Sequence, residues 1–324
     1  MSRTIHRRTF LTTAAAAVAA VAVSGPARAD APGITTAFEL PGDRVYPEGI
    51  ALDPRTGDVY VGSYGEGTVY RTRPGRRTAE VLLPAGTDGR HTANGLRVDA
   101  AGRLWVTDST AGVCVYDPRT RDLLARFDVP GPAPFLVNDL AITADGTAYL
   151  TDSVRAVLYR VTPAEVSRGG RGVLRVAHDL SGALAPRPAG SPFSLNGVVT
   201  DGRRLFVVDM PVGELFRVDP AGGAVRRVEL LGGDLRHGDG LELAHGTLWA
   251  AHNATDTLTR WRLAPDGRTA RLERTLTDPA LQIPTTLVRH RGRLLVVRSQ
   301  FDKGGPFGPG VPETPFSVAA VRGI

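Results

Sequence analysis

The amino-acid sequence predicts an all-β protein, a six-bladed β-propeller with four antiparallel strands in each blade. From residue 34 to residue 322, short segments alternate polar and apolar residues and end at Gly, Pro or Asp. Alternation over about four to eight residues is typical of half-buried strands. Six copies of one such segment recur at intervals of 43 to 58 residues. A repeat of this kind, built from four short strands, is typical of a propeller blade.

The first copy, residues 46–71, defines the strands of one blade. Its sequence, YPEGIALDPRTGDVYVGSYGEGTVYR, predicts strands over 48–52, 58–63 and 67–71, with a DPRTG turn between the first two. Later copies begin near residues 91, 135, 193, 236 and 282. A fourth strand is predicted after each of the first five copies, over residues 79–83, 123–129, 173–177, 224–230 and 268–276.

The sixth copy is incomplete, and this predicts how the ring closes. Residues 285–291, 293–298 and 316–322 supply three strands, and residues 34–40 are expected to supply the fourth from the other end of the chain. Because one four-stranded sheet cannot bury both of its faces, neighbouring blades have to cover each other. The N-terminal strand therefore closes a single propeller domain over residues 30–324.

The first 29 residues have the features of a twin-arginine signal peptide. Arg7 and Arg8 precede a short apolar run from Ala14 to Val23, and an A-x-A cleavage site ends at Ala29. The run is short for a spanning helix, which needs about 20 apolar residues. We expect cleavage after residue 29, export of the folded protein through the twin-arginine pathway, and a secreted or cell-envelope location without a membrane span. A retained membrane anchor is the alternative.

Composition argues against two further classes of protein. The formal net charge is +6 at pH 7, but four arginines fall in the predicted signal peptide, which leaves +2 for residues 30–324. No basic cluster is interleaved with aromatic residues, so nucleic-acid binding is not expected. Cys114 is the only cysteine, so the chain forms no internal disulfide. Its place in a predicted strand indicates a small buried core residue.

One residue opens the innermost strand of each predicted blade. In a propeller these positions meet at one mouth of the central channel. Five of them offer a carboxylate or carboxamide oxygen, and oxygen donors of this kind suit a hard cation, above all Ca²⁺. The alternative is turn chemistry, because Asn-Gly and Asp-Gly are common turn dipeptides. The six residues are Glu48, Asn94, Asn138, Asn196, Asp239 and Thr285.

These motifs make the sequence similar to the SMP-30/gluconolactonase/LRE family of six-bladed propellers, over nearly all of residues 30–324. In that family a Glu of the first blade, an Asn of the third, an Asn of the fourth and an Asp of the fifth hold a divalent cation in the channel. The resemblance implies one such ion, with Ca²⁺ first and Zn²⁺, Mn²⁺ or Mg²⁺ as alternatives. The matching dipeptides, whose first residues would bind the ion, are Glu48-Gly49, Asn138-Asp139, Asn196-Gly197 and Asp239-Gly240.

The chain departs from the sugar lactonases of that family at the substrate end of the channel. Those members tend to carry Arg two residues before the third-blade Asn, where this chain has Leu136. Tyr46, Phe193 and Leu195 are also expected at the channel mouth. Pockets with apolar walls favour apolar ligands. We therefore expect a small-molecule substrate that is more apolar than a hexose lactone.

The resemblance implies a hydrolase of a lactone or an ester. The cation would polarise the substrate carbonyl, and Asp239 or a nearby His would take a proton from the attacking water. Related paraoxonase-type enzymes use channel histidines, and the candidates here are His237, His91 and His252. Asn94 is expected behind the ligands or facing the substrate. The alternatives are a lyase, an isomerase or a phosphotriester hydrolase on the same site, and a non-enzymatic ligand-binding propeller.

Other repeated positions predict structural roles. One Asp stands at the end of the second strand in each of blades two to four, and these residues are Asp108, Asp152 and Asp209. They are expected to accept hydrogen bonds from turn backbone. Arg298 takes the equivalent place in blade six and could reach the channel. Two loops, residues 178–192 and 299–316, are candidate lids over a channel mouth.

Overall fold

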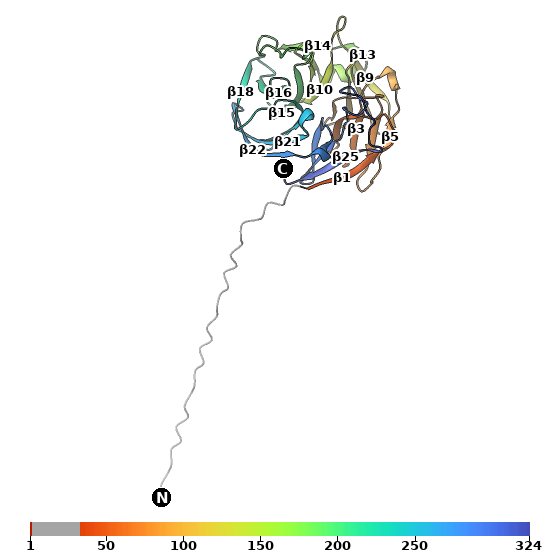
Figure 1. Cartoon of the computed structure of the whole chain (residues 1–324). Coiled ribbons are helices and arrows are strands. Elements are labelled where there is room, and N and C mark those ends of the chain that lie inside the picture. The colour runs from red at the N-terminus through yellow and green to blue at the C-terminus, as the bar shows by residue number, and fades with distance from the viewer. Residues whose placement is uncertain (2–32) are drawn as a thin grey trace. The chain divides into compact units, whose positions relative to one another are not determined.

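The computed structural model describes Met1 and residues 33–324 (Figure 1). The predicted signal peptide, residues 1–29, lies outside the continuous described range. The regular secondary structure of residues 33–324 is almost entirely β-strand, as predicted, and the strands form a β-propeller. No helix in the described part of the chain is long and apolar enough to cross a membrane.

Strand pairing joins the described strands into five sheets, three of four strands, one of five and one of eight, in which a parallel pairing of β18 with β22 joins two halves. Within these sheets, runs of four antiparallel strands follow the sequence repeat and are called units here. The first unit contains β2 (Pro47–Leu52), β3 (Val59–Ser63), β4 (Val69–Thr72) and β5 (Glu80–Leu83). The second contains β6 (Leu96–Val98), β7 (Leu104–Asp108), β8 (Gly112–Tyr116) and β9 (Leu123–Asp128). The third contains β10 (Val137–Ile142), β11 (Ala148–Asp152), β12 (Val157–Val161) and β14 (Arg175–Asp179).

The remaining units follow the same order, with the first strand of each innermost. The fourth contains β15 (Leu195–Thr200), β16 (Leu205–Asp209), β17 (Glu214–Val218) and β18 (Val225–Leu231). The fifth contains β19 (Gly238–Ala244), β20 (Thr247–His252), β21 (Thr257–Leu263) and β22 (Thr269–Thr277). The sixth contains β23 (Leu287–His290), β24 (Arg293–Val297), β25 (Phe316–Arg322) and β1 (Gly33–Leu40).

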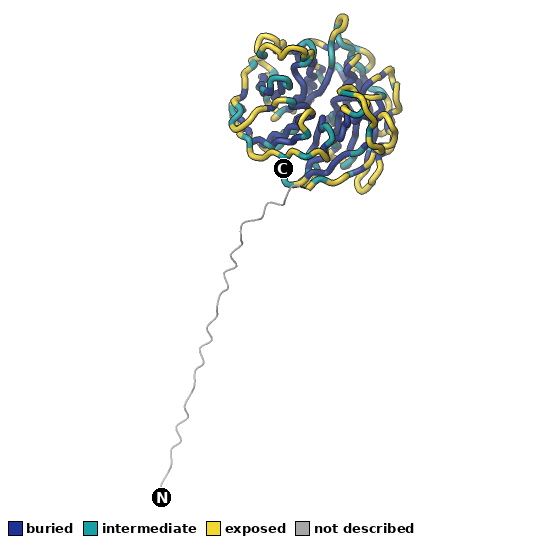
Figure 2. Tube along the Cα trace, in the orientation of Figure 1, coloured by how far each residue is buried: buried dark blue, intermediate teal, exposed yellow. Residues whose placement is uncertain are grey.

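The N-terminal strand closes the ring, as the sequence predicts. β1 pairs with β25 in antiparallel register, with Ile34 opposite Val321, and lies beside it in Figure 1. Six clusters of buried apolar side chains each join two neighbouring units, so every unit covers the face of the next. Figure 2 shows this pattern, with buried strands inside and exposed turns at the rim. Burial between units therefore stabilises the ring, because one sheet alone leaves two apolar faces exposed.

The structure corrects the sequence prediction around the third unit. Its outer strand is β14, two residues later than the predicted 173–177. Residues Gly170–Val173 instead form β13, which runs parallel to β9 of the second unit. A short helix, α1 (Pro163–Arg168), lies between β12 and β13, and its N-terminus is capped reciprocally by Thr162 and Glu165. The long spacing before the fourth copy therefore holds an inserted helix and strand as well as a loop.

Candidate functional site

A cavity of about 360 Å³ lies where the inner strands of the ring begin. Its walls include all four predicted metal ligands and Asn94. The four predicted ligands lie on β2, β10, β15 and β19, and Asn94 lies two residues before β6. All five side chains belong to buried residues. The structure therefore gathers residues from five units around one cavity: Glu48, Asn94, Asn138, Asn196 and Asp239.

The sixth predicted position has another place. Thr285 is fully buried and does not line the cavity. Its hydroxyl donates a hydrogen bond of 2.9 Å to the backbone carbonyl of Glu48. Thr285 therefore fixes the first unit against the sixth and orients the strand that carries Glu48.

Glycines allow the inner strands to approach closely enough for this arrangement. A Cβ atom on Gly49 would lie 1.7 Å from the carbonyl oxygen of Asn94, and one on Gly197 would lie 2.2 Å from that of Asp239. Neither glycine has a left-handed backbone, and both lie within strands. Glycine is needed here because backbones meet without room for a side chain. The Asn-Gly and Asp-Gly pairs of β15 and β19 are therefore not turn dipeptides.

Hydrogen bonds orient the carboxamides of the site. The side-chain nitrogen of Asn138 donates to Ser153 Oγ at 3.1 Å. That of Asn196 contacts Met210 Sδ at 3.4 Å, and that of Asn253 donates to Asp239 Oδ2 at 2.6 Å. With the nitrogens of Asn138 and Asn196 engaged, their oxygens are the atoms left to bind a ligand.

The two carboxylates of the site are held in an environment that disfavours their charge. Burial, followed by the charges of Asp239 and Asp139, raises the pKa of Glu48 well above its usual value. Burial also raises the pKa of Asp239 to about 7, although hydrogen bonds from Asn253 and Asn196 oppose the shift. Two buried carboxylates destabilised in this way call for a positive charge between them.

Buried oxygen atoms without a hydrogen-bond partner also indicate that the site binds a positively charged ligand. Glu48 Oε2 and Asn94 Oδ1 are buried and have no hydrogen-bond partner among the described residues. Such atoms are rare in folded proteins and indicate an unseen ligand or strain. No group of three or more His, Cys, Asp or Glu side chains in the described part of the chain could hold a metal ion. The candidate centre is of another kind, since it combines two carboxylates with carboxamides. This oxygen-only donor set fits a hard divalent cation such as Ca²⁺.

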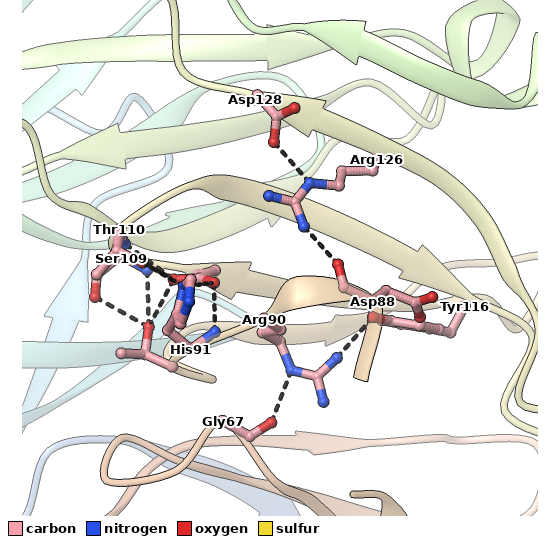
Figure 3. A network of polar contacts seen from close by, with 11 residues as sticks. Gly67, Asp88, Arg90, His91, Ser109, Thr110, Tyr116, Arg126 and Asp128 are labelled. Atoms are coloured by element: carbon pink, nitrogen blue, oxygen red, sulfur yellow. Dashed lines mark hydrogen bonds and ion pairs between the residues drawn. The ribbon is translucent and has the colours of Figure 1, made fainter. Parts of the chain in front are cut away.

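The three candidate histidines have different surroundings, and only His237 lines the cavity. His91 has a 75% exposed side chain and lies beside Thr110, outside the cavity (Figure 3). His252 is buried away from the cavity, with its ring nitrogens 2.8 Å from Arg236 O and 2.7 Å from Thr259 Oγ1. Burial lowers the pKa of His252. Of the four predicted catalytic residues, Asp239 and His237 therefore line the cavity, whereas His91 and His252 do not.

A buried arginine fixes the loop that leads to Asn94. Arg90 donates from Nε to Gly67 O at 2.8 Å and from Nη1 to Tyr116 Oη at 2.6 Å (Figure 3). Arg126 holds the same loop by donating to Asp88 O at 2.7 Å. These bonds join the first unit to the second and give Asn94 a defined position at the cavity wall.

Sequence reasoning missed a second ring of cavity residues. Tyr64, Ser153, Met210 and Asn253 each directly follow the second strand of their unit, and all four line the cavity. They share one position of the repeat, just as the ligands share another. That common register was the signal that could have found them.

The loop over residues 299–316 contributes to the cavity as expected. Phe301, Pro306 and Phe307 line it, and the rings of Phe301 and Phe307 meet edge to face with centroids 5.3 Å apart. The loop is anchored through Gln300, whose side chain exchanges hydrogen bonds of 2.9 and 2.7 Å with the backbone of Glu313. It therefore forms an ordered aromatic wall.

Some of the other residues expected at the channel mouth line the cavity, and others lie behind its wall. Phe193 and Leu136 line the cavity, whereas no residue of the second candidate lid, 178–192, does. Tyr46 and Leu195 are buried behind the wall. Tyr46 supports it by donating to Lys303 O at 3.0 Å.

Two of the three repeated aspartates behave as predicted. Asp108 accepts from the backbone of His91 and Thr110, and Asp152 accepts from Leu136, Val154 and Arg155. Asp209 differs, because neither of its oxygens has a partner among the described residues. Pro211 occupies the place of the donating residue and has no backbone N–H.

Arg298 does not line the cavity, contrary to the expectation that it could reach the channel. Its guanidinium donates to Ala280 O, Thr36 Oγ1 and Ser317 Oγ at 2.8 to 3.1 Å. Arg298 thus joins the strands of ring closure. Cys114 is buried in β8, as predicted.

The fold is shared with many solved structures. A gluconolactonase from Xanthomonas campestris superposes with a TM-score of 0.61 at 18% identity, covering 91% of each chain. Virginiamycin B lyase from Staphylococcus aureus superposes with a TM-score of 0.55 at 11% identity, covering 90% of this chain and 99% of the lyase. An aldose sugar dehydrogenase from Streptomyces coelicolor, in its PQQ-bound form, superposes with a TM-score of 0.57 at 16% identity, covering 90% of this chain and 98% of the dehydrogenase.

Sequence comparison alone finds no relative. No protein-family model matches the chain, and no curated protein matches it. At these low identities the solved structures show the β-propeller fold and no particular activity.

Proposed function

We propose that the protein is a metal-dependent hydrolase of a lactone or an ester. The observation that carries the proposal is one cavity in which two buried, charge-destabilised carboxylates, Glu48 and Asp239, meet the oriented carboxamides of Asn138 and Asn196. These four residues would hold one divalent cation, with Ca²⁺ expected first. When bound, the cation would supply Lewis acidity toward a substrate carbonyl.

The residues of the chain then divide the remaining work. Asp239, whose carboxylate is oriented by Asn253, accepts the proton of the attacking water, and His237 is the alternative acceptor in the same wall. Asn94 lines the cavity, and its buried Oδ1 has no partner among the described residues, so it is the acceptor that we propose for a hydrogen bond from the substrate. Phe193, Phe301 and Phe307 exclude water from the apolar part of the substrate. An apolar lactone or ester therefore fits this wall better than a sugar lactone.

A second candidate is a lyase acting on the same site. A carbonyl polarised by a cation would have a more acidic α-proton, and Asp239 and His237 lie in the cavity wall from which a base could remove it. The similarity of the fold to virginiamycin B lyase favours this candidate.

The test is metal content together with substrate screening. Purified protein is dialysed against Ca²⁺ and analysed for metal beside Asp239→Ala, with Asp209→Asn as the matched control, since Asp209 is buried outside the cavity. We expect about one equivalent of ion in the parent and control and little in Asp239→Ala. Turnover of apolar lactones or esters would support the hydrolase, whereas elimination products would support the lyase. A parent that binds no ion would contradict the proposal.

Export is also part of the proposal and has its own test. The N-terminal sequence supports twin-arginine export with cleavage after Ala29. The exported protein should begin at Asp30, and replacing Arg7 and Arg8 by Lys should leave the uncleaved chain in the cytoplasm. Unchanged export of that variant would refute the assignment.

A further inference from the structure

A second set of charged side chains lies on the inner strands beside the candidate metal centre. Arg97 is on β6, Asp139 on β10 and Glu242 on β19. Arg97 Nη2 donates to Asp139 Oδ2 at 3.2 Å. The positive charge of Arg97 also lowers the pKa values of Glu48, Asp139 and Glu242, against the opposing effect of burial. One guanidinium group thus acts on three carboxyl groups from three different units, two of them buried and the third, of Glu242, partly buried.

Asp139 occupies an unusual position in the repeat. Four other units have glycine directly after the residue that opens the inner strand, whereas the third has Asp139. Its carboxylate fills the space that Gly95 leaves open, since a Cβ atom there would lie 2.9 Å from Asp139 Oδ1. Oδ2 is shared by Arg97 and the backbone N–H of Val198, and Oδ1 has no partner among the described residues. A buried carboxylate with an unpartnered oxygen favours binding of a cation unless a neighbouring positive charge compensates its negative charge.

The balance of buried charge points to one divalent ion. The inner strands carry four carboxylates beside the cavity or below it, Glu48, Asp139, Asp239 and Glu242. Arg97 offsets one of these charges. Arg289 offsets another, since its backbone N–H donates to Glu242 Oε1 at 3.4 Å and its charge lowers the pKa of that carboxyl against the effect of burial. One divalent cation then neutralises the remaining two charges, and a second divalent cation would leave an excess of positive charge in a buried space.

We propose that the guanidinium group of Arg97 is a permanent counter-cation for the carboxylates of the inner strands. It occupies the position at which Asp139 and Glu242 could bind a second divalent cation, and it thereby limits the site to one such ion. The inference rests on the proposed metal site. Arg97 is here a positioning residue, since it lines no part of the substrate cavity.

The test is the stoichiometry of Ca²⁺ binding, measured by equilibrium dialysis and elemental analysis. The parent and the conservative control Arg97→Lys should bind one equivalent. Arg97→Met, which keeps the volume and removes the charge, should bind two at millimolar Ca²⁺. One equivalent in Arg97→Met with an unchanged Kd would overturn this inference alone. A parent without any bound ion would overturn the proposed function and the inference with it.

A second pair of variants keeps the inference testable if Arg97→Met does not fold. Asp139→Asn leaves the guanidinium charge in excess beside the metal centre, so the Kd for Ca²⁺ should rise about tenfold. Arg97→Met combined with Asp139→Asn removes both charges of the pair and should restore one equivalent with a Kd near that of the parent. An unchanged Kd in Asp139→Asn would overturn the inference.

Discussion

Asn253 donates a hydrogen bond of 2.6 Å to the carboxylate of Asp239 and links the two rings of residues that line the cavity. Asp239 opens the inner strand of the fifth unit, and Asn253 follows the second strand of the same unit. The bond opposes the effect of burial on the pKa of Asp239. A residue directly after the neighbouring strand therefore lowers the proton affinity that burial gives to the proposed base.

Removing that hydrogen bond should shift the pH dependence of the site upward. In Asn253→Ala the carboxylate loses a donor that stabilises its charge, so the pKa of Asp239 should rise above about 7 and metal binding should require higher pH. The measurement is Ca²⁺ affinity from pH 5 to 9. Ser153→Ala is the matched control, because it frees the non-titrating carboxamide of Asn138 and should weaken binding without moving the midpoint. An unmoved midpoint in Asn253→Ala would refute the role of the bond.

The ion-free protein should lose stability as pH rises. Asp239 has a pKa of about 7 in the folded protein and about 3.9 when unfolded. Between these values the folded state binds the extra proton, so the free energy of unfolding should fall from about pH 4 to pH 7 and then level off. Glu48 contributes in the same direction.

Calcium should reverse that trend, because the ion binds the ionised carboxylates. Unfolding temperatures with Ca²⁺ and with a chelator should therefore diverge as the pH rises from 5 to 8. Asp239→Asn should reduce the divergence. A constant difference across the range would show that these carboxyl groups do not bind the ion.

The repeat fixed most of the fold in advance, since period-two alternation and turn residues mark each strand. The meeting of Glu48, Asn138, Asn196 and Asp239 at one cavity was also predictable, because all four share one register of the repeat. The inserted helix and β13 were not, because they interrupt the repeat and depend on pairing with β9. The histidines show another limit, since sequence proximity placed His91 near Asn94 while the loop turns its side chain toward Thr110.

Close approach of the inner strands predicts a large cost for one added methyl group. In Gly49→Ala the new Cβ would overlap the carbonyl oxygen of Asn94, and backbone cannot move aside as a flexible side chain can. We expect destabilisation of about 3 kcal/mol or more. Gly182→Ala is the control, since its Cβ would meet nothing within 4 Å. Denaturant unfolding would measure both, and equal stability of the two variants would contradict the close contact.

The aromatic wall predicts how substrate preference can be changed. Phe307 lines the cavity and is 54% exposed, so truncation should disturb the fold little. In Phe307→Ala the KM for substrates with large apolar groups should rise about tenfold, since burial of an aromatic contact is worth about 1.5 kcal/mol. Substrates with small acyl groups should be affected less. The same factor for both kinds of substrate would refute a role in selectivity.

Asp209 should be a site where substitution stabilises the protein. Both of its oxygens are buried and have no hydrogen-bond partner within residues 33–324, and burial raises its pKa to about 6. Because the unfolded carboxyl ionises near pH 3.9, the native state loses stability as pH rises from about 4 to 6. Asp209→Asn removes the charge and should raise the free energy of unfolding by about 1–3 kcal/mol at pH 8. The gain should be smaller at pH 4, where the native carboxyl is protonated.

Asp152→Asn is the control for this prediction, since the Asp152 carboxylate accepts several backbone hydrogen bonds, and the substitution should destabilise the protein. A loss of stability in Asp209→Asn at pH 8 would instead reveal a partner for the Asp209 carboxylate.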